Sequence, residues 1–446
     1  MYSYKKKSCI KLNSNQKNNH LQSEFLNCIE KCSQILSLLN EYTDLKNLWM
    51  INKNLWNSNE HKFLCYFNLN KYKSKVYWKS KKFRTYIHSK VFNPNKQISL
   101  NLYGEITDIS IIRNVHRLDL SLSYGITDVS CLENIHTLIL HGLEITNVST
   151  LGNVHTLDLS YCNQVTDVSM LGKVHNLNLS WCNKITDVST LGNVHTLDLF
   201  NCFGITDVSH LRNNHTLNLS RCYFISDVTN LRKVHTLDLS YCHRITDVST
   251  LGKVHTLNLS NCVGITDVSA LGNIHTLNLS GCNRIRDVSH LGNVHTLDLK
   301  GCTEIRDVSR LGKVHTLNLS GCQRISDVNG LGNVHTLDLS HCQELTDVSH
   351  LGNVHTLNLS CCNRIIDVSH LGNVHTLNLS CCDGIIDVST LGDVHTLILS
   401  FCDGITDVSM LGNIHSLDIS CCSGITDTSM LTNIMELDIL DCDGII

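Results

Sequence analysis

The chain has 446 residues and a formal net charge of −4, but its charge is unevenly distributed. Residues 1–97 carry 18 Lys and Arg against 5 Asp and Glu, whereas the remaining residues carry 18 against 35. No apolar run is long enough to span a bilayer, and Lys5, Lys6 and Lys7 are not followed by the apolar core of a secretory signal. We therefore expect an intracellular, cytoplasmic protein that contacts no membrane. The basic segment is interpreted as a solvated surface rather than a nucleic-acid site.

The N-terminal 97 residues differ in composition from the rest of the chain. Residues 1–20 are polar and rich in Lys and Asn, which predicts a disordered lead-in. Apolar residues then recur at helical spacing, starting with Phe25, Ile29 and Cys32. The pattern predicts a small, basic, helical domain over residues 21–97, and Pro94, the only proline, marks its junction with the following segment.

One part of this domain has a distinctive sequence, in which Asp44-Leu45 is followed by Leu48, Trp49, Ile51, Lys53 and Trp56. This segment resembles the middle of an F-box, although the usual Leu-Pro opening is missing. The resemblance implies docking to a Skp1-type adaptor of a cullin-type ubiquitin ligase. The alternative is a helical cap that shields the first repeats. The residues that would mix core and docking positions are Ile35, Leu36, Leu45, Leu48 and Ile51.

Residues 98–446 are internally repetitive. From Leu157 onward the motif V-H-T-L-(D/N)-L-S-x-C-x-x-I-T-D-V-S-x-L-G-(N/K) returns every 20 residues, and its Cys column runs from Cys162 to Cys442 without a slip. Earlier units, which start at Leu100, are less regular. Segments of this type predict about 18 short strands, one for each repeat.

The residues of one unit predict its local structure. Alternating Leu157 and Leu159 indicate a short strand, and Asp167 is placed to accept hydrogen bonds at the start of a helical turn. Gly172 is expected to let the chain reverse direction. A single unit cannot bury its apolar stripe, but stacked units can.

The V-x-x-L-x-L-x-x-C-x-x-I segment resembles the conserved part of leucine-rich repeats. The I-T-D-V-S-x-L segment is similar to the repeats of bacterial internalins, and Cys at this position is shared with F-box/leucine-rich-repeat proteins. The resemblance implies an α/β solenoid with a parallel concave sheet. Because 20 residues leave no room for full helices, we expect short 3₁₀ or irregular convex turns. The near-identical repeats also resemble arrays of large DNA viruses of amoebae, which would place the protein in a host cell.

Two further sets of residues that recur once per repeat, the Cys column and the His column, consist of side chains that can bind metal ions. The Cys column is explained by packing of small, buried thiols, with disulfides or metal thiolates as the alternative. Doublets such as Cys361-Cys362 place a second thiol on the outer face. Sixteen histidines run from His116 to His415, just ahead of the strands. Metal binding or loosening of the array below pH 6 are alternatives to simple duplication. No metal and no cofactor is assigned.

A catalytic interpretation is rejected. His155, Asp158 and Ser160 recur as a trio in many units, without an oxyanion-hole loop or a cleft. In the strand column that contains Asp158, Asp and Asn nearly alternate, which avoids like charges on paired strands. The chain is therefore not expected to be an enzyme.

Binding is assigned to positions that vary between repeats. Tyr161, Trp181, Arg221 and Tyr241 occupy the variable position before Cys, and these residue types are common in binding hot spots. We expect them to contact a protein target on the concave face, with neutral drift as the alternative. The absence of a polar cap at Ile446 also predicts end-to-end dimers or fraying.

Taken together, the sequence predicts a protein-protein interaction module. The first interpretation is an adaptor that recruits substrates to a cullin-type ubiquitin ligase through its F-box-like head. The alternative is a leucine-rich-repeat binding or scaffold protein with no ubiquitin link.

Overall fold

The computed structural model describes residues 67–89, 98–106 and 108–440. The chain divides into two compact units, the first formed by residues 1–102 and 114–118 and the second by residues 103–113 and 119–446. None of the helices in the described ranges has the length and apolar character that crossing a bilayer requires.

The first unit contains two helices and two strands among its described residues. Helices α4 (Lys71–Lys79) and α5 (Lys81–Ser89) agree with the helical pattern, but strand β1 (Phe67–Leu69) pairs in parallel with β2 (Ile98–Asn101). Strand β1 was not predicted from the sequence, because three residues are too few for a visible alternation. Buried Ser74 links α4 to both strands, since its Oγ donates to the Leu69 carbonyl at 2.8 Å and accepts from Asn101 N at 3.0 Å.

Eighteen short strands, β2 to β19, recur along the described part of the repeats, as predicted. From β4 onward each strand pairs in parallel and in register with the next, so that Leu157 lies opposite Leu177. Besides β2, these strands are β3 (Arg117–Asp119), β4 (Thr137–Ile139), β5 (Thr156–Asp158), β6 (Asn176–Asn178), β7 (Thr196–Asp198), β8 (Thr216–Asn218), β9 (Thr236–Asp238), β10 (Thr256–Asn258), β11 (Thr276–Asn278), β12 (Thr296–Asp298), β13 (Thr316–Asn318), β14 (Thr336–Asp338), β15 (Thr356–Asn358), β16 (Thr376–Asn378), β17 (Thr396–Ile398), β18 (Ser416–Asp418) and β19 (Glu436–Asp438).

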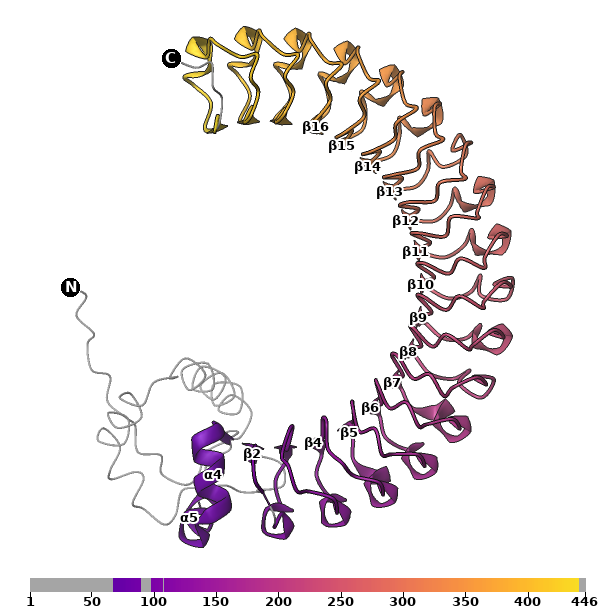
Figure 1. Cartoon of the computed structure of the whole chain (residues 1–446), viewed down its shortest axis with the longest axis vertical. Coiled ribbons are helices and arrows are strands. Elements are labelled where there is room, and N and C mark those ends of the chain that lie inside the picture. Colours follow the sequence, from indigo (N-terminus) through magenta and orange to yellow (C-terminus); the bar gives the residue numbers. More distant parts are fainter. Residues whose placement is uncertain (1–66, 90–97, 107, 441–446) are drawn as a thin grey trace, which may run out of the picture. The chain divides into compact units, whose positions relative to one another are not determined.

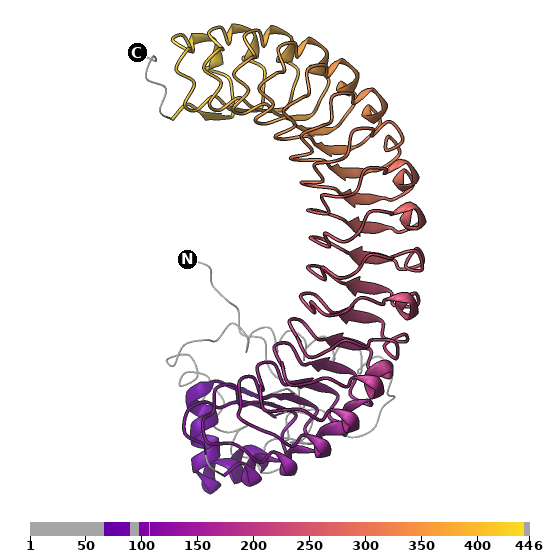
Figure 2. The same cartoon turned by 45° about the vertical axis from the view of Figure 1, so that its right-hand side comes forward.

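Short 3₁₀ helices connect the strands of the second unit. The strands lie along the inner, concave side of this unit and the 3₁₀ turns along its outer, convex side (Figure 1). Figure 2 shows that the backbone follows the same course in successive repeats. The turns are η1 (Ser110–Ile112), η2 (Ser130–Leu132), η3 (Ser149–Asn153), η4 (Ser169–Leu171), η5 (Ser189–Asn193), η6 (Thr229–Leu231), η7 (Ser269–Leu271), η8 (Ser289–Leu291), η9 (Asn329–Leu331), η10 (Ser349–Leu351), η11 (Ser369–Leu371), η12 (Ser389–Leu391), η13 (Ser409–Leu411) and η14 (Ser429–Leu431).

The core is one continuous column of apolar side chains. A central unit contributes seven buried residues, which in the unit that starts at Val154 are Val154, Leu157, Leu159, Cys162, Val165, Val168 and Leu171. In-register pairing places each of them against its equivalent in the next repeat. A unit therefore buries its apolar stripe only when it has neighbours on both sides.

The cysteine column consists of buried thiols that donate weak hydrogen bonds. Cys162 Sγ donates to the Leu140 carbonyl at 3.2 Å, and Cys182 Sγ donates to the Leu159 carbonyl at 3.1 Å. Burial raises the pKa of Cys162 to about 11 and that of Cys182 to about 12. These thiols stay protonated at neutral pH, in agreement with the packing interpretation.

The aspartates that precede the 3₁₀ turns cap them as predicted. Asp167 Oδ1 accepts from Ser169 N at 2.9 Å, and Asp267 Oδ1 accepts from Ser269 N at the same distance. These backbone hydrogen bonds lower the pKa of both carboxyl groups. One capped turn in each repeat satisfies backbone N–H groups that the short turn leaves without a helical partner.

The glycine at the end of the turn has a different role from the one predicted. Gly172 has a φ of −63°, which any residue can adopt. A Cβ atom at this position would lie 2.4 Å from the carbonyl oxygen of Thr190 in the next repeat. Close approach of neighbouring turns, rather than chain reversal, therefore selects glycine here.

Candidate functional site

The residue that precedes each buried cysteine lies three positions after a concave strand ends, and its backbone is left-handed. The φ angle is +61° at Tyr161, +64° at Trp181 and +59° at Arg221. Glycine occupies this position in three central repeats, at Gly281, Gly301 and Gly321, and side chains return in the repeats that follow. A residue with a side chain is disfavoured by about 1 kcal/mol in this conformation. The early repeats therefore keep bulky side chains at a backbone position that favours glycine.

Six side chains of the early repeats form one continuous row of contacts. Tyr161 and Trp181 stack with ring centroids 5.2 Å apart, and Trp181 meets Phe200 edge to face at 5.9 Å. The Arg221 guanidinium lies 5.8 Å from the centroid of Phe200 and 4.9 Å from that of Tyr241. We call this set the aromatic–arginine row; it consists of His141, Tyr161, Trp181, Phe200, Arg221 and Tyr241.

The structure thus brings together all four residues that the sequence singled out for partner binding. The sequence did not identify Phe200, which joins the Trp181 pair to the Arg221 pair, or His141, which meets Tyr161 edge to face at 5.1 Å. A signal for Phe200 was present, because it replaces the serine found in most repeats. The row is accessible, since 43% of Tyr161 is exposed.

A second, shorter group of aromatic side chains follows the loop after the cysteines. Phe203 stacks on Tyr223 at 5.6 Å, and Tyr223 stacks on His243 at 5.7 Å. Arg244 lies 4.7 Å from the Phe224 ring centroid. The same repeats that carry the aromatic–arginine row therefore also carry the aromatic loop residues.

Carboxylates line the concave strands of the same repeats. Asp158, Asp198 and Asp238 alternate with Asn178 and Asn218 on β5 to β9. Asp158 Oδ1 accepts from Ser160 N at 2.8 Å, and burial raises the pKa of Asp198. The strand surface next to the row therefore carries carboxyl groups.

Asn201 occupies the left-handed position between Trp181 and Arg221 and is only 2% exposed. Its Nδ2 atom has no hydrogen-bond partner among the described residues. An unsatisfied buried donor costs about 1–3 kcal/mol. Asn201 thus places a buried amide donor at the position between Trp181 and Arg221.

The trio that resembles a catalytic triad has other contacts. Ser160 Oγ donates to Asp158 Oδ1 at 2.6 Å, whereas His155 Nδ1 lies 3.2 Å from Thr156 Oγ1. Ser160 is also buried, and its Oγ lies 2.8 Å from Nδ1 of His141 rather than near His155. Asp158 and Ser160 lie at the end of β5, whereas His155 precedes the strand.

The histidine column forms a stack along the strand starts of the second unit. Its fifteen rings have neighbouring centroids 4.5–4.8 Å apart. We call it the histidine ladder; it consists of His136, His155, His175, His195, His215, His235, His255, His275, His295, His315, His335, His355, His375, His395 and His415.

The ladder predicts that the repeats lose stability in mild acid. Desolvation lowers the pKa of His155, His195 and His235, and the flanking imidazoles lower it further. Because the folded-state pKa lies below the unfolded value of about 6.5, the unfolded chain binds protons first as pH falls. Stability is therefore complete above about pH 6.5 and declines as pH falls through the folded-state pKa values. We expect a lower melting temperature at pH 5.5 than at pH 7.5, and equal midpoints would contradict this.

The outer thiols lie where the doublets predicted. Cys361, Cys381 and Cys421 are half-buried at left-handed positions, in contrast to the fully buried Cys362 and Cys382. The Cys381 thiol has its pKa raised by partial burial and by its neighbour Cys361. Together with Cys131, these outer thiols are the partly exposed cysteines among the described repeats.

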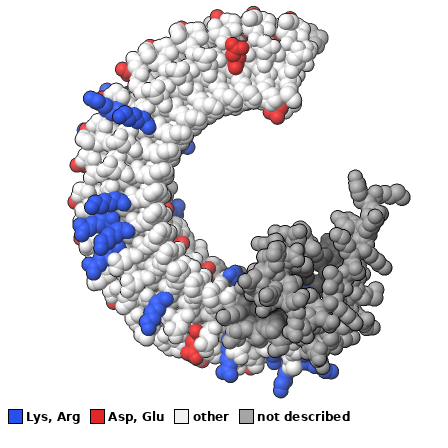
Figure 3. Space-filling view, turned by 180° about the vertical axis from the view of Figure 1, so that it is seen from behind, with Lys and Arg blue, Asp and Glu red and all other residues white. Residues whose placement is uncertain are grey.

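Charged side chains on the flank of the second unit form exposed pairs. Lys and Arg gather in groups on the face shown in Figure 3. Glu304 contacts Arg324 at 2.8 Å and Arg286 at 3.5 Å, and Arg364 pairs with Glu344. Exposed pairs of this kind contribute at most about 1 kcal/mol each. We interpret them as a solvated surface.

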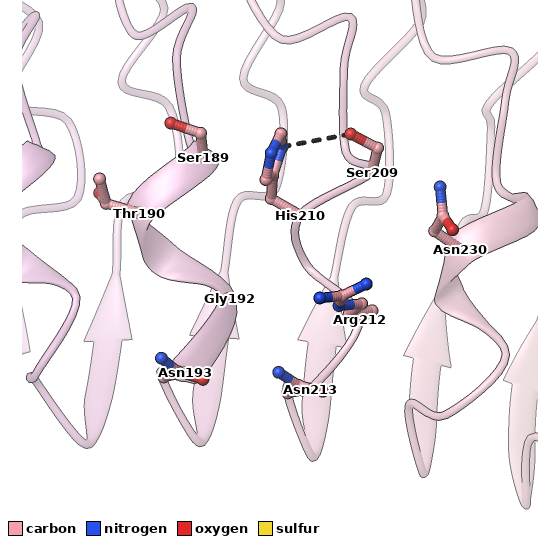
Figure 4. A pocket seen from close by; sticks show the side chains of 9 residues that line it. All are labelled: Ser189, Thr190, Gly192, Asn193, Ser209, His210, Arg212, Asn213 and Asn230. Carbon is pink, nitrogen blue, oxygen red and sulfur yellow. Dashed lines mark hydrogen bonds between the residues drawn. The ribbon is translucent and has the colours of Figure 1, made fainter.

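A hollow of about 430 Å³ lies on the convex side, between the turns of three repeats (Figure 4). Arg212, which replaces the turn glycine of neighbouring repeats, lines it together with His210, Asn193 and Asn230. His210 Nδ1 lies 3.2 Å from Ser209 Oγ. Because nearly all of its lining side chains are exposed, the hollow offers weaker anchoring than the aromatic–arginine row.

The predicted adaptor-docking residues cannot be compared with this geometry. Ile35, Leu36, Leu45, Leu48 and Ile51 lie outside the described residues. Their role stays a prediction from the sequence.

Comparisons with known proteins agree on the fold. A family model described as a leucine-rich repeat matches residues 230–249. A solved leucine-rich-repeat protein from Leptospira interrogans is 18% identical, covers 86% of this chain and 97% of its own, and superposes with a TM-score of 0.51. The fold is a leucine-rich-repeat solenoid.

Two solved Listeria monocytogenes structures are also similar to this solenoid. The internalin InlF is 23% identical over 68% of this chain and 86% of its own, with a TM-score of 0.45. The functional domain of InlJ, described as including a cysteine ladder, is 21% identical over 70% of each chain, with a TM-score of 0.43. A search of curated protein sequences finds no match.

Proposed function

We propose that this leucine-rich-repeat solenoid is a protein-interaction module that holds its partner on the aromatic–arginine row. The observation that carries the proposal is the unbroken contact of the row across neighbouring repeats; four of its side chains stand at the left-handed position that is glycine at Gly281, Gly301 and Gly321. Tyr, Trp and Arg supply most of the energy at protein interfaces, and stacked side chains lose little entropy on binding.

The charges beside the row favour a protein partner over a nucleic acid. Asp158, Asp198 and Asp238 follow the same repeats, whereas Arg221 is the only cation in the row. A partner segment with apolar or aromatic side chains would pack on the row, and its Lys or Arg residues would pair with the carboxylates of the neighbouring strands. Single-stranded nucleic acid could stack on the rings, but its phosphates would meet the carboxylates.

Substitution of the row tests the proposal. Proximity labelling with the full-length protein identifies partners, and their affinities are then measured for Trp181→Ala and Phe401→Ala. Phe401 is a matched control, because it has the same left-handed backbone and is 55% exposed, but has no ring partner among the described residues. We expect Trp181→Ala to weaken binding about 30-fold and Phe401→Ala to have little effect. Equal effects of the two substitutions would contradict the proposal.

We further propose that the bound protein is recruited to a cullin-type ubiquitin ligase through the N-terminal segment. This proposal rests on the F-box-like residues Asp44, Leu45, Leu48 and Ile51. The expected result is that the full-length chain co-purifies with a Skp1-type adaptor, that Leu45→Asp and Leu48→Asp abolish this association, and that Trp181→Ala does not. Partner binding without any adaptor association would instead indicate a scaffold protein with no ubiquitin link.

A further inference from the structure

The histidine ladder is not used by the proposed protein-binding function, yet its neighbouring rings keep a nearly constant spacing of 4.5–4.8 Å. We propose that neighbouring imidazoles of the ladder bind divalent transition-metal ions of the Ni²⁺, Cu²⁺ and Zn²⁺ class, as a row of two-histidine sites. Imidazole nitrogen is a ligand that suits all three ions.

The ring nitrogens are arranged as in metal-binding histidines. In thirteen of the fifteen rings, Nδ1 lies 3.2–3.4 Å from the hydroxyl oxygen of the following threonine. When this hydroxyl accepts a hydrogen bond from Nδ1–H, Nε2 is the ring nitrogen that carries the lone pair. A hydrogen bond from the second ring nitrogen to an oxygen is the usual outer-shell arrangement of metal-ligating histidine.

The spacing of the rings is close to what a shared ion requires. Metal–nitrogen bonds of about 2.0–2.1 Å allow two ligand nitrogens to lie up to about 4.2 Å apart. Neighbouring ring centroids such as those of His375 and His395 lie 4.5 Å apart. The planes of His375 and His395 are only 11° apart, so both rings must turn about their side-chain bonds before their two Nε2 lone pairs can meet at one ion. Because nearly all ladder side chains are exposed, this rotation does not disturb the core.

The number of available ligands sets the kind of site. Within the described ranges no group of three or more His, Cys, Asp and Glu side chains is placed to hold a metal ion. Each site therefore has two protein ligands, and water completes the coordination, which makes the bound ions exchangeable. Since one ring serves one ion, fifteen rings provide at most seven separate sites.

The net charge of the repeats favours cation binding, and the imidazole ligands make this binding depend on pH. Residues 98–446 carry more Asp and Glu than Lys and Arg, which favours cation binding over the whole body of the solenoid. Protons compete with metal ions for Nε2, so binding should be strong at pH 7.5 and weak at pH 5.5.

Two full-length variants with equal numbers of histidines test whether pairs are needed. The alternating variant changes every second ring to Gln, at His155, His195, His235, His275, His315, His355 and His395. The contiguous variant changes seven successive rings to Gln, at His295, His315, His335, His355, His375, His395 and His415. Each variant keeps eight ladder histidines, but these form four pairs in the contiguous variant and none in the alternating one.

Equilibrium dialysis against Ni²⁺ at pH 7.5 gives the result. We expect about seven ions per unaltered chain, about four for the contiguous variant, and close to none for the alternating variant at the same free Ni²⁺ concentration. Equal binding by the two variants would overturn the proposal, because it would show that single imidazoles suffice. Binding of no Ni²⁺ by the unaltered chain would overturn it as well. Circular dichroism checks that both variants are folded.

A measurement on the unaltered chain gives an answer even if a variant does not fold. Diethyl pyrocarbonate modifies accessible imidazoles, and mass spectrometry locates each modified histidine. We expect saturating Ni²⁺ to protect ladder members such as His335 and His375, whereas His210 on the convex side stays reactive. Equal modification of ladder and convex histidines in the presence of Ni²⁺ would contradict paired binding.

Discussion

Replacement of Leu257 by alanine is expected to lower the free energy of unfolding by about 3 kcal/mol. Leu257 lies at the centre of β10, fully buried between Leu237 of β9 and Leu277 of β11. The substitution removes buried methyl groups and leaves a cavity that in-register neighbours cannot fill without breaking their own stacking. Urea unfolding followed by circular dichroism measures the change.

The matched control for this prediction is Val263→Ala in the same repeat. Val263 is apolar but 38% exposed, so its truncation should change stability by less than about 0.5 kcal/mol. Because each repeat contacts only its neighbours, hydrogen exchange in Leu257→Ala should increase mainly in β9, β10 and β11. An increase spread evenly over all strands, or a loss of stability no larger than that of the control, would disagree with the stacked core.

Replacement of Gly272 by alanine is expected to destabilise the protein by about 2 kcal/mol, although alanine is the better residue for the local backbone. Gly272 has a φ of −65°, and a Cβ atom there would lie 2.1 Å from the His290 carbonyl oxygen in the next repeat. The backbone of one of the two turns must therefore move to make room for the alanine Cβ atom. Other residues occupy the equivalent position in five repeats, which shows that the array can accommodate such a shift; they are Arg113, Glu133, Arg212, Arg232 and Thr432.

Gly301→Ala separates this steric effect from backbone preference. Gly301 has a φ of +70°, and the nearest atom to an added Cβ would be 4.0 Å away. This substitution should cost about 1 kcal/mol, from the left-handed conformation alone. Thermal or urea unfolding of both variants gives the comparison. A smaller loss for Gly272→Ala than for Gly301→Ala would mean that the turns do not approach each other as closely as described.

The sequence by itself determined the solenoid fold, because units that repeat every 20 residues can bury their apolar stripes only by stacking on one another. It also determined the number of repeat strands, the capping role of Asp167 and the burial of Cys162. These features depend on contacts within one unit or between identical units. In a repeating sequence, the residues that make such contacts recur at a fixed spacing, so the contacts can be predicted from that spacing.

Only the tertiary structure decided which side chains of neighbouring repeats contact each other. It assigned the turn glycines to close packing, placed Trp181 and Arg221 at left-handed positions, and joined them through Phe200. It also stacked the histidines into a ladder and added strand β1. These outcomes depend on distances between side chains twenty residues apart, which the order of residues along the chain does not contain.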